Sequence, residues 1–313
     1  MTAATENIEK SVLVYDVGGS HVSAAVCLQN GYKLGPVVSA LHPAQQTSDA
    51  FIQLLYALGI EAGADTASVA GAELAMPGPF DFAAGVSQMR HKLPYLFGLD
   101  LRQKLSQRFG WEPCRVRFLH DAAAFLLGEI GAGAARGVSR AVGITLGTGV
   151  GSAFSVNGSI IIEGSGVPLG GEIWNLAYQG GIVEDFVSSK AIRRTYEQRT
   201  GMLREAVEIA SKAANDPAAF EAFTELGHHL GLALRSPLAV FAPQVVILGG
   251  GISRSGNLFL AATRHELEDL SIKVVISSLL DEAPLVGAAV SWFNECNSSS
   301  ALPQKVPIQL DAS

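Results

Sequence analysis

Apolar residues occur along the chain in two arrangements, short runs typical of strands and longer stretches with helical spacing. The run Val12 to Val17 ends at Gly18-Gly19-Ser20, and a second apolar segment, Val22 to Leu28, leads into Asn30-Gly31. Because Asn-Gly favours a tight turn between antiparallel strands, the chain is expected to open with a strand, a glycine turn and a second strand.

The same arrangement occurs again near the middle of the chain. Val142 to Leu146 leads into Gly147-Thr148-Gly149-Val150-Gly151, and Ser152 to Val156 predicts the following strand. Asn157-Gly158 then turns into Ser159 to Glu163. This weak internal repeat predicts two α/β halves, each opening with an antiparallel hairpin whose glycine turn can face a shared cleft.

Between the two hairpins the pattern alternates between helix and strand. Ser48 to Gly63 has the leucine spacing of an amphipathic helix, and Ser68 to Ala75 is typical of a buried strand. Arg115 to Leu119 predicts another strand, and Asp121 to Ile130 predicts a helix. Asp121 is therefore expected where a strand gives way to a helix, a position that collects ligands in α/β folds.

The chain from Val183 onward predicts further helices and two strands. The strand Val245 to Leu248 precedes Gly249-Gly250-Gly251, which places a third glycine turn after a strand. Asn297 to Ser313 contains serines and prolines and is expected to be a loosely held tail. The remaining predicted elements are helices over Val183 to Arg199, Leu203 to Ala214, Ala218 to Leu238 and Pro284 to Asn294, and a strand over Lys273 to Ser277.

Composition limits the class of protein. With 313 residues, 48% hydrophobic and 16% charged, the chain can bury a large core and suits two domains across a cleft. A net charge of -7 offers no general attraction to polyanions, so we expect neither nucleic-acid nor membrane partners. The polar start, Met1 to Lys10, and the lack of an apolar run of about 20 residues predict a cytoplasmic protein. Three isolated cysteines suggest no disulfide framework.

The glycine turns suggest phosphate binding, because backbone N–H groups can converge on an anion where no side chain intervenes. No G-x-x-x-x-G-K-[ST] is present, and Gly147-Thr148-Gly149-Val150-Gly151 does not complete G-x-G-x-x-G. A single glycine cluster is usually only a tight turn. Three such clusters, each after a strand, favour a nucleotide site of another kind.

Two aspartates are candidates for the chemistry of such a site. Asp16 ends the first strand, where it could hold Mg²⁺ through water beside a phosphate or simply cap the glycine turn. Asp121 could accept the proton of a hydroxyl that attacks the terminal phosphate of ATP, or it could be an ordinary helix cap. The local sequence alone favours the capping roles.

A series of motifs resembles those of the ROK family of sugar kinases. Asp16-Val17-Gly18-Gly19-Ser20 resembles its first phosphate motif, and His120-Asp121-Ala122-Ala123-Ala124 through Gly128-Glu129 resembles its N-D-x-x-A-x-x-x-G-E stretch. The resemblance runs from about Val12 to Phe293. The other motifs, in the family's order, are Met76-Pro77-Gly78-Pro79, Gly147-Thr148-Gly149-Val150-Gly151, Gly170-Gly171-Glu172-Ile173, Gly181-Ile182-Val183-Glu184 and Leu248-Gly249-Gly250-Gly251.

The resemblance implies an α/β protein with the actin-like ATPase (ribonuclease H-like) fold, two α/β lobes around a cleft. Residues 1–119 would form the small lobe, 120–296 the large lobe, and a C-terminal helix over about 284–295 would pack on the small lobe. The family also implies a homodimer.

The function implied is ATP-dependent phosphorylation of a hexose, glucokinase-like and at the 6-hydroxyl, with Asp121 as general base. Mg²⁺ would accompany ATP near Asp16. The residues implied to bind the sugar are Gly78, Lys92, His120, Asp121, Glu172, Asn175 and Glu184. Those implied to bind ATP are Asp16, Gly18, Gly19, Ser20, Gly147, Thr148, Gly149, Gly151, Gly249, Gly250 and Gly251.

The sequence departs from the family on the substrate side. Asn175 stands where ROK proteins commonly have a zinc-binding His, and no cysteine follows before Glu184, so we expect no structural zinc. His120 replaces the usual Asn, and Lys92 lies where another Asn would bind sugar. The sugar therefore stays open among glucose, fructose, mannose, an N-acetylhexosamine and a glycoside.

Two non-enzymatic alternatives also stay open. The first is a sugar-sensing regulator of the same family, although only 11 residues precede Val12, too few for the winged helix-turn-helix such regulators carry. The second is a sugar-binding protein without catalysis.

Overall fold

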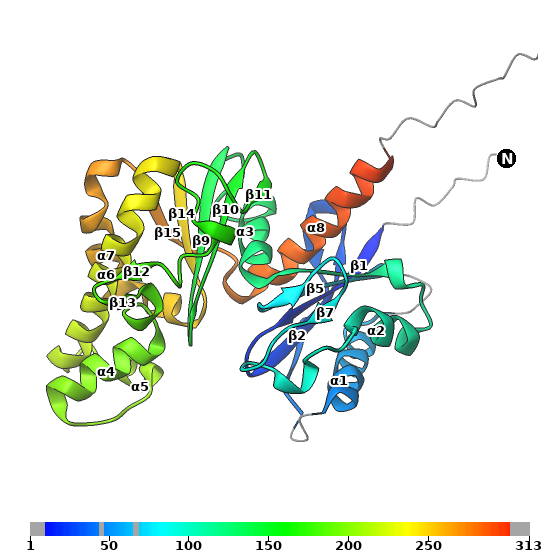
Figure 1. The fold of residues 1–313 in the computed structure, drawn as a ribbon, viewed down its shortest axis with the longest axis horizontal. Helices are drawn as coiled ribbons and strands as arrows, with labels where there is room; N and C mark the ends of the chain where they lie inside the picture. Colours follow the sequence, from blue (N-terminus) through cyan, green and yellow to red (C-terminus); the bar gives the residue numbers. More distant parts are fainter. Residues whose placement is uncertain (1–9, 44–46, 65–68, 301–313) are drawn as a thin grey trace, which may run out of the picture.

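The computed structural model describes residues 10–43, 47–64 and 69–300, with side chains as far as residue 296, and contains two main sheets (Figure 1). In the first sheet the strand order is β3-β2-β1-β5-β8, with β4 also paired to β2. β1 runs antiparallel to β2 and parallel to β5, which is parallel to β8. The strands are β1 Ser11–Val17, β2 His21–Leu28, β3 Lys33–Leu34, β4 Val38–Leu41, β5 Val69–Met76 and β8 Val116–His120.

The second sheet repeats this plan, with strand order β11-β10-β9-β14-β15. β9 and β10 form an antiparallel hairpin, while β14 lies parallel to both β9 and β15. Both predicted opening hairpins are therefore present, as the internal repeat indicated. The strands are β9 Arg140–Leu146, β10 Val150–Val156, β11 Ser159–Ile161, β14 Val245–Gly249 and β15 Lys273–Ile276.

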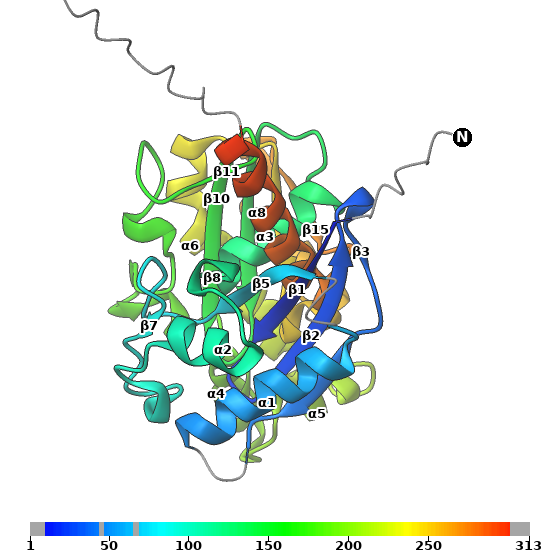
Figure 2. The ribbon, with the colours of Figure 1, turned by 90° about the vertical axis from the view of Figure 1, so that its right-hand side faces the viewer.

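Strand β1 is buried on both faces, which explains its continuous apolar run. Leu13 and Tyr15 belong to a core cluster with residues of α1, Ser48–Glu61, and α2, Leu101–Phe109. Val12 and Val14 instead pack with residues of α8, Ala283–Ser300. Figure 2 shows α1 and α2 on one side of this sheet and α8 on the other.

The second sheet is covered in the same way. Val142, Ile144 and Leu146 pack in a core cluster with helices α4, α5 and α6, whereas Ala141 packs in a separate cluster with α3. The helices are α3 Asp121–Gly131, α4 Ser189–Thr200, α5 Ala206–Lys212, α6 Pro217–Phe241 and α7 Leu260–Glu266. Two small hairpins complete the strands: β6 Phe80–Asp81 with β7 Val86–Ser87, and β12 Ala177–Tyr178 with β13 Gly181–Ile182.

Helices α3 and α8 cross closely between the two sheets, in contact with each other and, for α8, with β1 and β5 (Figure 1). A methyl group at Gly287 of α8 would overlap the backbone of Ala124, and one at Gly128 of α3 would overlap the backbone of Ala283. The two glycines therefore allow backbone contact that no larger residue permits.

Some element boundaries differ from prediction. The helix expected from Val183 begins at Ser189, because the Ser188 hydroxyl accepts a hydrogen bond from the N–H of Ala191 and caps it there. Val183–Asp185 forms one separate 3₁₀ turn. The terminal helix expected over Pro284 to Asn294 is longer than predicted, since α8 continues to Ser300 and includes the first four residues of the expected tail. Residues 301–313 lie outside the described part. None of the helices in the described ranges has the length and apolar character that a bilayer crossing requires.

Candidate active site

The carboxyl ends of β1, β5 and β8 meet at one edge of the first sheet. Asp16 pairs with Ala75, and Met76 pairs with His120, so the segments after these strands start side by side. A methyl group at Gly78, two residues past β5, would lie 3.7 Å from Nε2 of His120. This edge therefore brings together Asp16, the Gly78 turn and the His120-Asp121 junction, as expected for a site in an α/β fold.

Asp121 is the first residue of α3, and His120 occupies the cap position. Oδ1 of Asp121 accepts a hydrogen bond from the N–H of Ala122 at 2.7 Å and lies 3.4 Å from Nδ1 of His120. The side chain is 36% exposed, and within the described residues no hydrogen bond reaches its Oδ2. Asp121 is thus not a cap of the usual kind, which bonds an N–H two or three residues ahead, and one oxygen remains open to a ligand.

Three carboxylates from distant segments interact at this edge. Burial of the Asp16 carboxyl, together with the negative charges of Asp121 and Asp281, raises its pKa to about 7. Asp281 lies in a 3₁₀ turn, Leu280–Glu282, just before α8 and pairs with Arg254. A cation bound nearby would offset this surplus of negative charge.

Glu129, the last residue of the second motif, fixes the segment that carries Asp281. Its fully buried carboxylate accepts hydrogen bonds from the hydroxyls of Ser277 and Ser278 at 2.5 and 3.2 Å and from the N–H of Leu279 at 3.1 Å. Because Glu129 and Asp121 belong to the same helix, α3 sets the distance between Asp121 and Asp281.

The second glycine turn, between β9 and β10, contacts Glu184, one of the acidic residues expected to bind substrate. Oε2 of Glu184 accepts a hydrogen bond from the N–H of Val150 at 3.0 Å, and a methyl group at Gly149 would lie 2.5 Å from the same oxygen. The N–H of Glu184 donates to the carbonyl of Trp174, whose Nε1 donates to Glu172 at 2.8 Å. Glu172 and Glu184 are therefore joined through Trp174 beside the turn.

The third glycine turn adjoins a cavity of about 450 Å³. Gly250 has φ of +79°, and a methyl group there would overlap the backbone of Leu146, so only glycine fits. The 3₁₀ segment that follows, Gly251–Leu258, supplies Arg254, Ser255 and Leu258 to the cavity. Its opposite wall comes from the α5–α6 region and includes Ala213 and Phe220. Arg254 also pairs with Asp281, so the cavity lies next to the three carboxylates of Asp16, Asp121 and Asp281.

Comparison with known proteins decides the family. The model of the ROK family matches residues 12–295, most of the chain. This protein belongs to the ROK family.

Individual ROK relatives support the assignment. The chain is 29% identical over 246 residues to a glucokinase of Thermotoga maritima, covering 68% of this chain and 76% of the relative. It is 26% identical over 172 residues to the N-acetylgalactosamine kinase AgaK of Shewanella sp. ANA-3, covering 48% and 55%. The ROK hexokinase of Thermus thermophilus has a TM-score of 0.76 at 25% identity, covering 92% and 99%. This ROK protein has the two-lobed, actin-like ATPase fold.

The fold of this ROK protein brings the second and third glycine turns against the helix of Asp121. A methyl group at Gly151 would lie 3.2 Å from Cβ of Ala122, and one at Gly249 would overlap the ring of Phe125. The first glycine turn is held by a separate contact, in which Nε2 of His42 lies 2.8 Å from the carbonyl oxygen of Gly18. Asp16, two residues before Gly18, also interacts electrostatically with Asp121.

Some residues expected in the site are not brought together. Lys92 and Asn175 are exposed, and the polar contacts of the described residues do not join either one to Asp121. Within the described ranges, no group of three or more His, Cys, Asp or Glu side chains is arranged to hold a metal ion. Any Mg²⁺ would thus draw most of its ligands from phosphate and water.

Sequence reasoning missed three residues of this region: Asp281, Arg254 and His42. Arg254 had an available signal, since it follows Gly251 by three residues. Asp281 and His42 had none, because each reaches the site through pairing of distant segments.

Proposed function

We propose that this ROK protein transfers the terminal phosphoryl group of ATP to a hydroxyl of a sugar, with Asp121 as general base. The observation that carries the proposal is the open oxygen of Asp121, beside Asp16 and on a helix that contacts two glycine turns. A base in this position can take a proton from a hydroxyl that points toward bound phosphates.

In the proposed reaction the sugar oxygen bonds to the terminal phosphorus while its proton passes to Asp121. The bond between that phosphorus and the bridging oxygen breaks, and ADP leaves. Backbone N–H groups of the glycine turns would hold the phosphates, and Mg²⁺ near Asp16 would offset their charge. Alignment of the two substrates supplies most of the remaining rate increase.

The cavity beside the third glycine turn fits the nucleoside part of ATP. Its volume of about 450 Å³ lies within the range of small-ligand sites. Phe220 and Leu258 offer apolar surface for a base, and Ser255 and Asn257 offer polar groups for a ribose. The triphosphate of a nucleotide bound in this cavity would extend past the third glycine turn toward Asp16 and Asp121.

The sugar would lie between His120 and the Glu172–Trp174–Glu184 group. Carboxylates accept hydrogen bonds from several hydroxyls and leave a costly unpaired group when one hydroxyl is missing or inverted. Similarity to a glucokinase supports a hexose, for which the family resemblance implies transfer to the 6-hydroxyl. Similarity to an N-acetylgalactosamine kinase supports testing N-acetylhexosamines as well.

A coupled assay of ADP release tests the proposal. Purified protein, ATP and Mg²⁺ are incubated with glucose, mannose, fructose, N-acetylglucosamine or N-acetylgalactosamine. At least one sugar should raise ADP formation well above the rate without sugar. No rise with any of these sugars, when calorimetry shows that one of them binds, would contradict the kinase assignment and favour a sugar-binding protein.

A further inference from the structure

The hairpin of β12 and β13 lies between the two acidic residues of the proposed sugar site. At its base the N–H of Val183 donates to the carbonyl of Leu176 at 3.0 Å, and the N–H of Glu184 donates to the carbonyl of Trp174 at 3.0 Å. Trp174 in turn bonds Glu172. The position of this hairpin therefore sets where Trp174 and Glu184 lie.

At its other end the hairpin is bonded to the middle of α6. The Oη of Tyr178 lies 2.9 Å from Nδ1 of His229, and the two rings meet edge to face with centroids 5.7 Å apart. Phe186 contacts both rings, with centroids at 5.2 Å from Tyr178 and 5.1 Å from His229. The three rings form one aromatic contact between segments that are about 50 residues apart in sequence.

The neighbouring groups define the direction of this hydrogen bond. The side-chain amide of Gln179 donates to Oη of Tyr178 at 3.3 Å, so the hydroxyl proton is available for Nδ1 of His229. Burial lowers the pKa of His229, which favours a neutral ring able to accept at Nδ1. The proton on Nε2 then faces Glu225, whose Oε1 lies 3.9 Å away.

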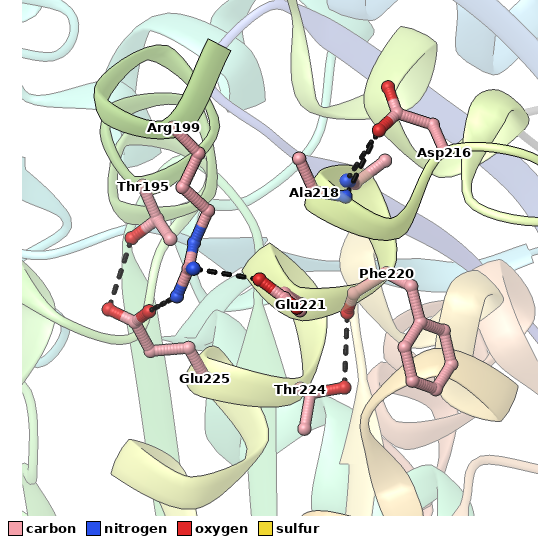
Figure 3. Close-up of polar contacts among 9 residues, drawn as sticks. Thr195, Arg199, Asp216, Ala218, Phe220, Glu221, Thr224 and Glu225 are labelled. Atoms are coloured by element: carbon pink, nitrogen blue, oxygen red, sulfur yellow. Dashed lines mark hydrogen bonds and ion pairs between the residues drawn. The ribbon is translucent and has the colours of Figure 1, made fainter.

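Glu225, the carboxylate that faces Nε2 of His229, is itself held by residues of α4. Glu225 accepts hydrogen bonds from Nη2 of Arg199 at 2.9 Å and from the hydroxyl of Thr195 at 3.3 Å, which ties α4 to α6 (Figure 3). Arg199 also binds Glu221 one turn earlier on α6. His229 is therefore carried by a helix that is cross-linked to α4 one turn before it.

Packing elsewhere along the hairpin is incomplete. A groove of about 470 Å³ separates the hairpin from the C-terminal part of α6. Leu176 and Ala177 line it on the hairpin side, and Leu232 and Ser236 on the helix side. Leu176 and Val183 at the base of the hairpin pack in the core cluster that includes α6 residues, and the Tyr178–His229 pair supplies a polar attachment beyond them.

We propose that Tyr178 and His229 are positioning residues that fasten the β12–β13 hairpin to α6 and so hold Trp174 and Glu184 in place for sugar binding. The proposal rests on the proposed function. Neither residue need touch the substrate. Both act through the backbone of the hairpin.

Kinetics of matched variants test this role. Tyr178→Phe keeps the ring and removes the hydroxyl, and we expect the sugar KM to rise about fivefold, the value of a typical hydrogen bond, with little change in kcat or in the KM for ATP. His229→Ala should have a larger effect in the same direction. His229→Asn, which places an amide oxygen near the position of Nδ1, should recover part of the loss. His228→Asn is the control, because His228 bonds Glu266 of α7 instead.

Hydrogen exchange provides a measurement that needs no activity. Amides of residues 174–184 should exchange faster in Tyr178→Phe and His229→Ala than in the wild type, and at the wild-type rate in His228→Asn. Unchanged exchange in the first two variants would overturn the proposal. Faster exchange with an unchanged sugar KM would overturn the link to the sugar site. A wild type that turns over no sugar would contradict the proposed function, and exchange would still decide whether the pair holds the hairpin.

Discussion

Glu184 accepts a hydrogen bond from the backbone N–H of Val150 at 3.0 Å, which fastens the end of the β12–β13 hairpin to the second glycine turn. The segment proposed to bind sugar and the turn proposed to bind phosphate therefore meet at a single carboxylate. A displacement of either one is expected to disturb the other, because the contact leaves no space for adjustment at Gly149.

Replacement of Gly149 by Ala tests this contact. The added methyl group would lie 2.5 Å from Oε2 of Glu184 and force the carboxylate away from Val150. We expect the KM values for sugar and for ATP both to rise, by about tenfold or more, the value of a hydrogen bond to a charged group. The melting temperature should fall only slightly, because the displaced atom is the end of a flexible side chain. Gly147→Ala is the control for stability, because a methyl group there meets no atom within 4 Å. Equal KM values in wild type and Gly149→Ala would show that the contact is not used in binding.

Replacement of Asp16 by Asn is expected to make the ligand-free protein more stable and less active. Its ionised form is costly in the ligand-free protein, since burial and two nearby carboxylates raise its pKa to about 7. Asp16→Asn should therefore raise the melting temperature at pH 8, where the wild-type group is charged, and lower turnover by on the order of 10²-fold, the usual cost of losing one electrostatic contact to a reacting phosphate. Thermal unfolding without ligand and coupled assays with Mg²⁺ give the two readings. A variant with full turnover would remove Asp16 from the site.

Glu73 is expected to make stability depend on pH. Its carboxyl is 1% exposed, one oxygen accepts a hydrogen bond from Ser291 of α8, and among the described residues no partner reaches the other. Burial and the charge of Glu295, opposed by Arg117, raise its pKa from 4.5 to about 8. Between these values the folded state binds more protons than the unfolded state, so stability falls as pH rises, by at most about 1.4 kcal/mol per pH unit.

The variant Glu73→Gln should remove that slope. Urea unfolding at pH 6 and pH 9 should show the variant more stable than the wild type at pH 9, with a smaller difference at pH 6. Glu61→Gln, at the exposed end of α1, changes a carboxylate without burial and should behave like the wild type. Parallel loss of stability in wild type and Glu73→Gln would mean that another group is responsible.

The sequence was sufficient where the signal was local. Both hairpins were predicted because an apolar run, a glycine turn and a second apolar run are adjacent in the chain. Asp121 was placed correctly at a strand-to-helix junction for the same reason. The ROK family, confirmed over residues 12–295, connects these local motifs within one known fold.

The sequence was insufficient where distant segments meet or two local signals compete. The Tyr178–His229 bond joins residues with no shared motif, and Asp281 acts on Asp16 only because α3 fixes the segment before α8. At the start of α4, the apolar residues from Val183 predicted a helix, but the Ser188 cap determines where it begins. The roles assigned to Lys92 and Asn175 stay predictions, since both side chains lie exposed.

Asp121 is proposed to accept the proton of the sugar hydroxyl, and the variant Asp121→Asn tests this role. The rate of sugar-dependent ADP formation is measured for wild type and for Asp121→Asn at saturating ATP, with sugar binding followed by calorimetry. We expect a loss of roughly 10²- to 10⁴-fold in turnover while sugar still binds. Turnover by Asp121→Asn near the wild-type rate would contradict it.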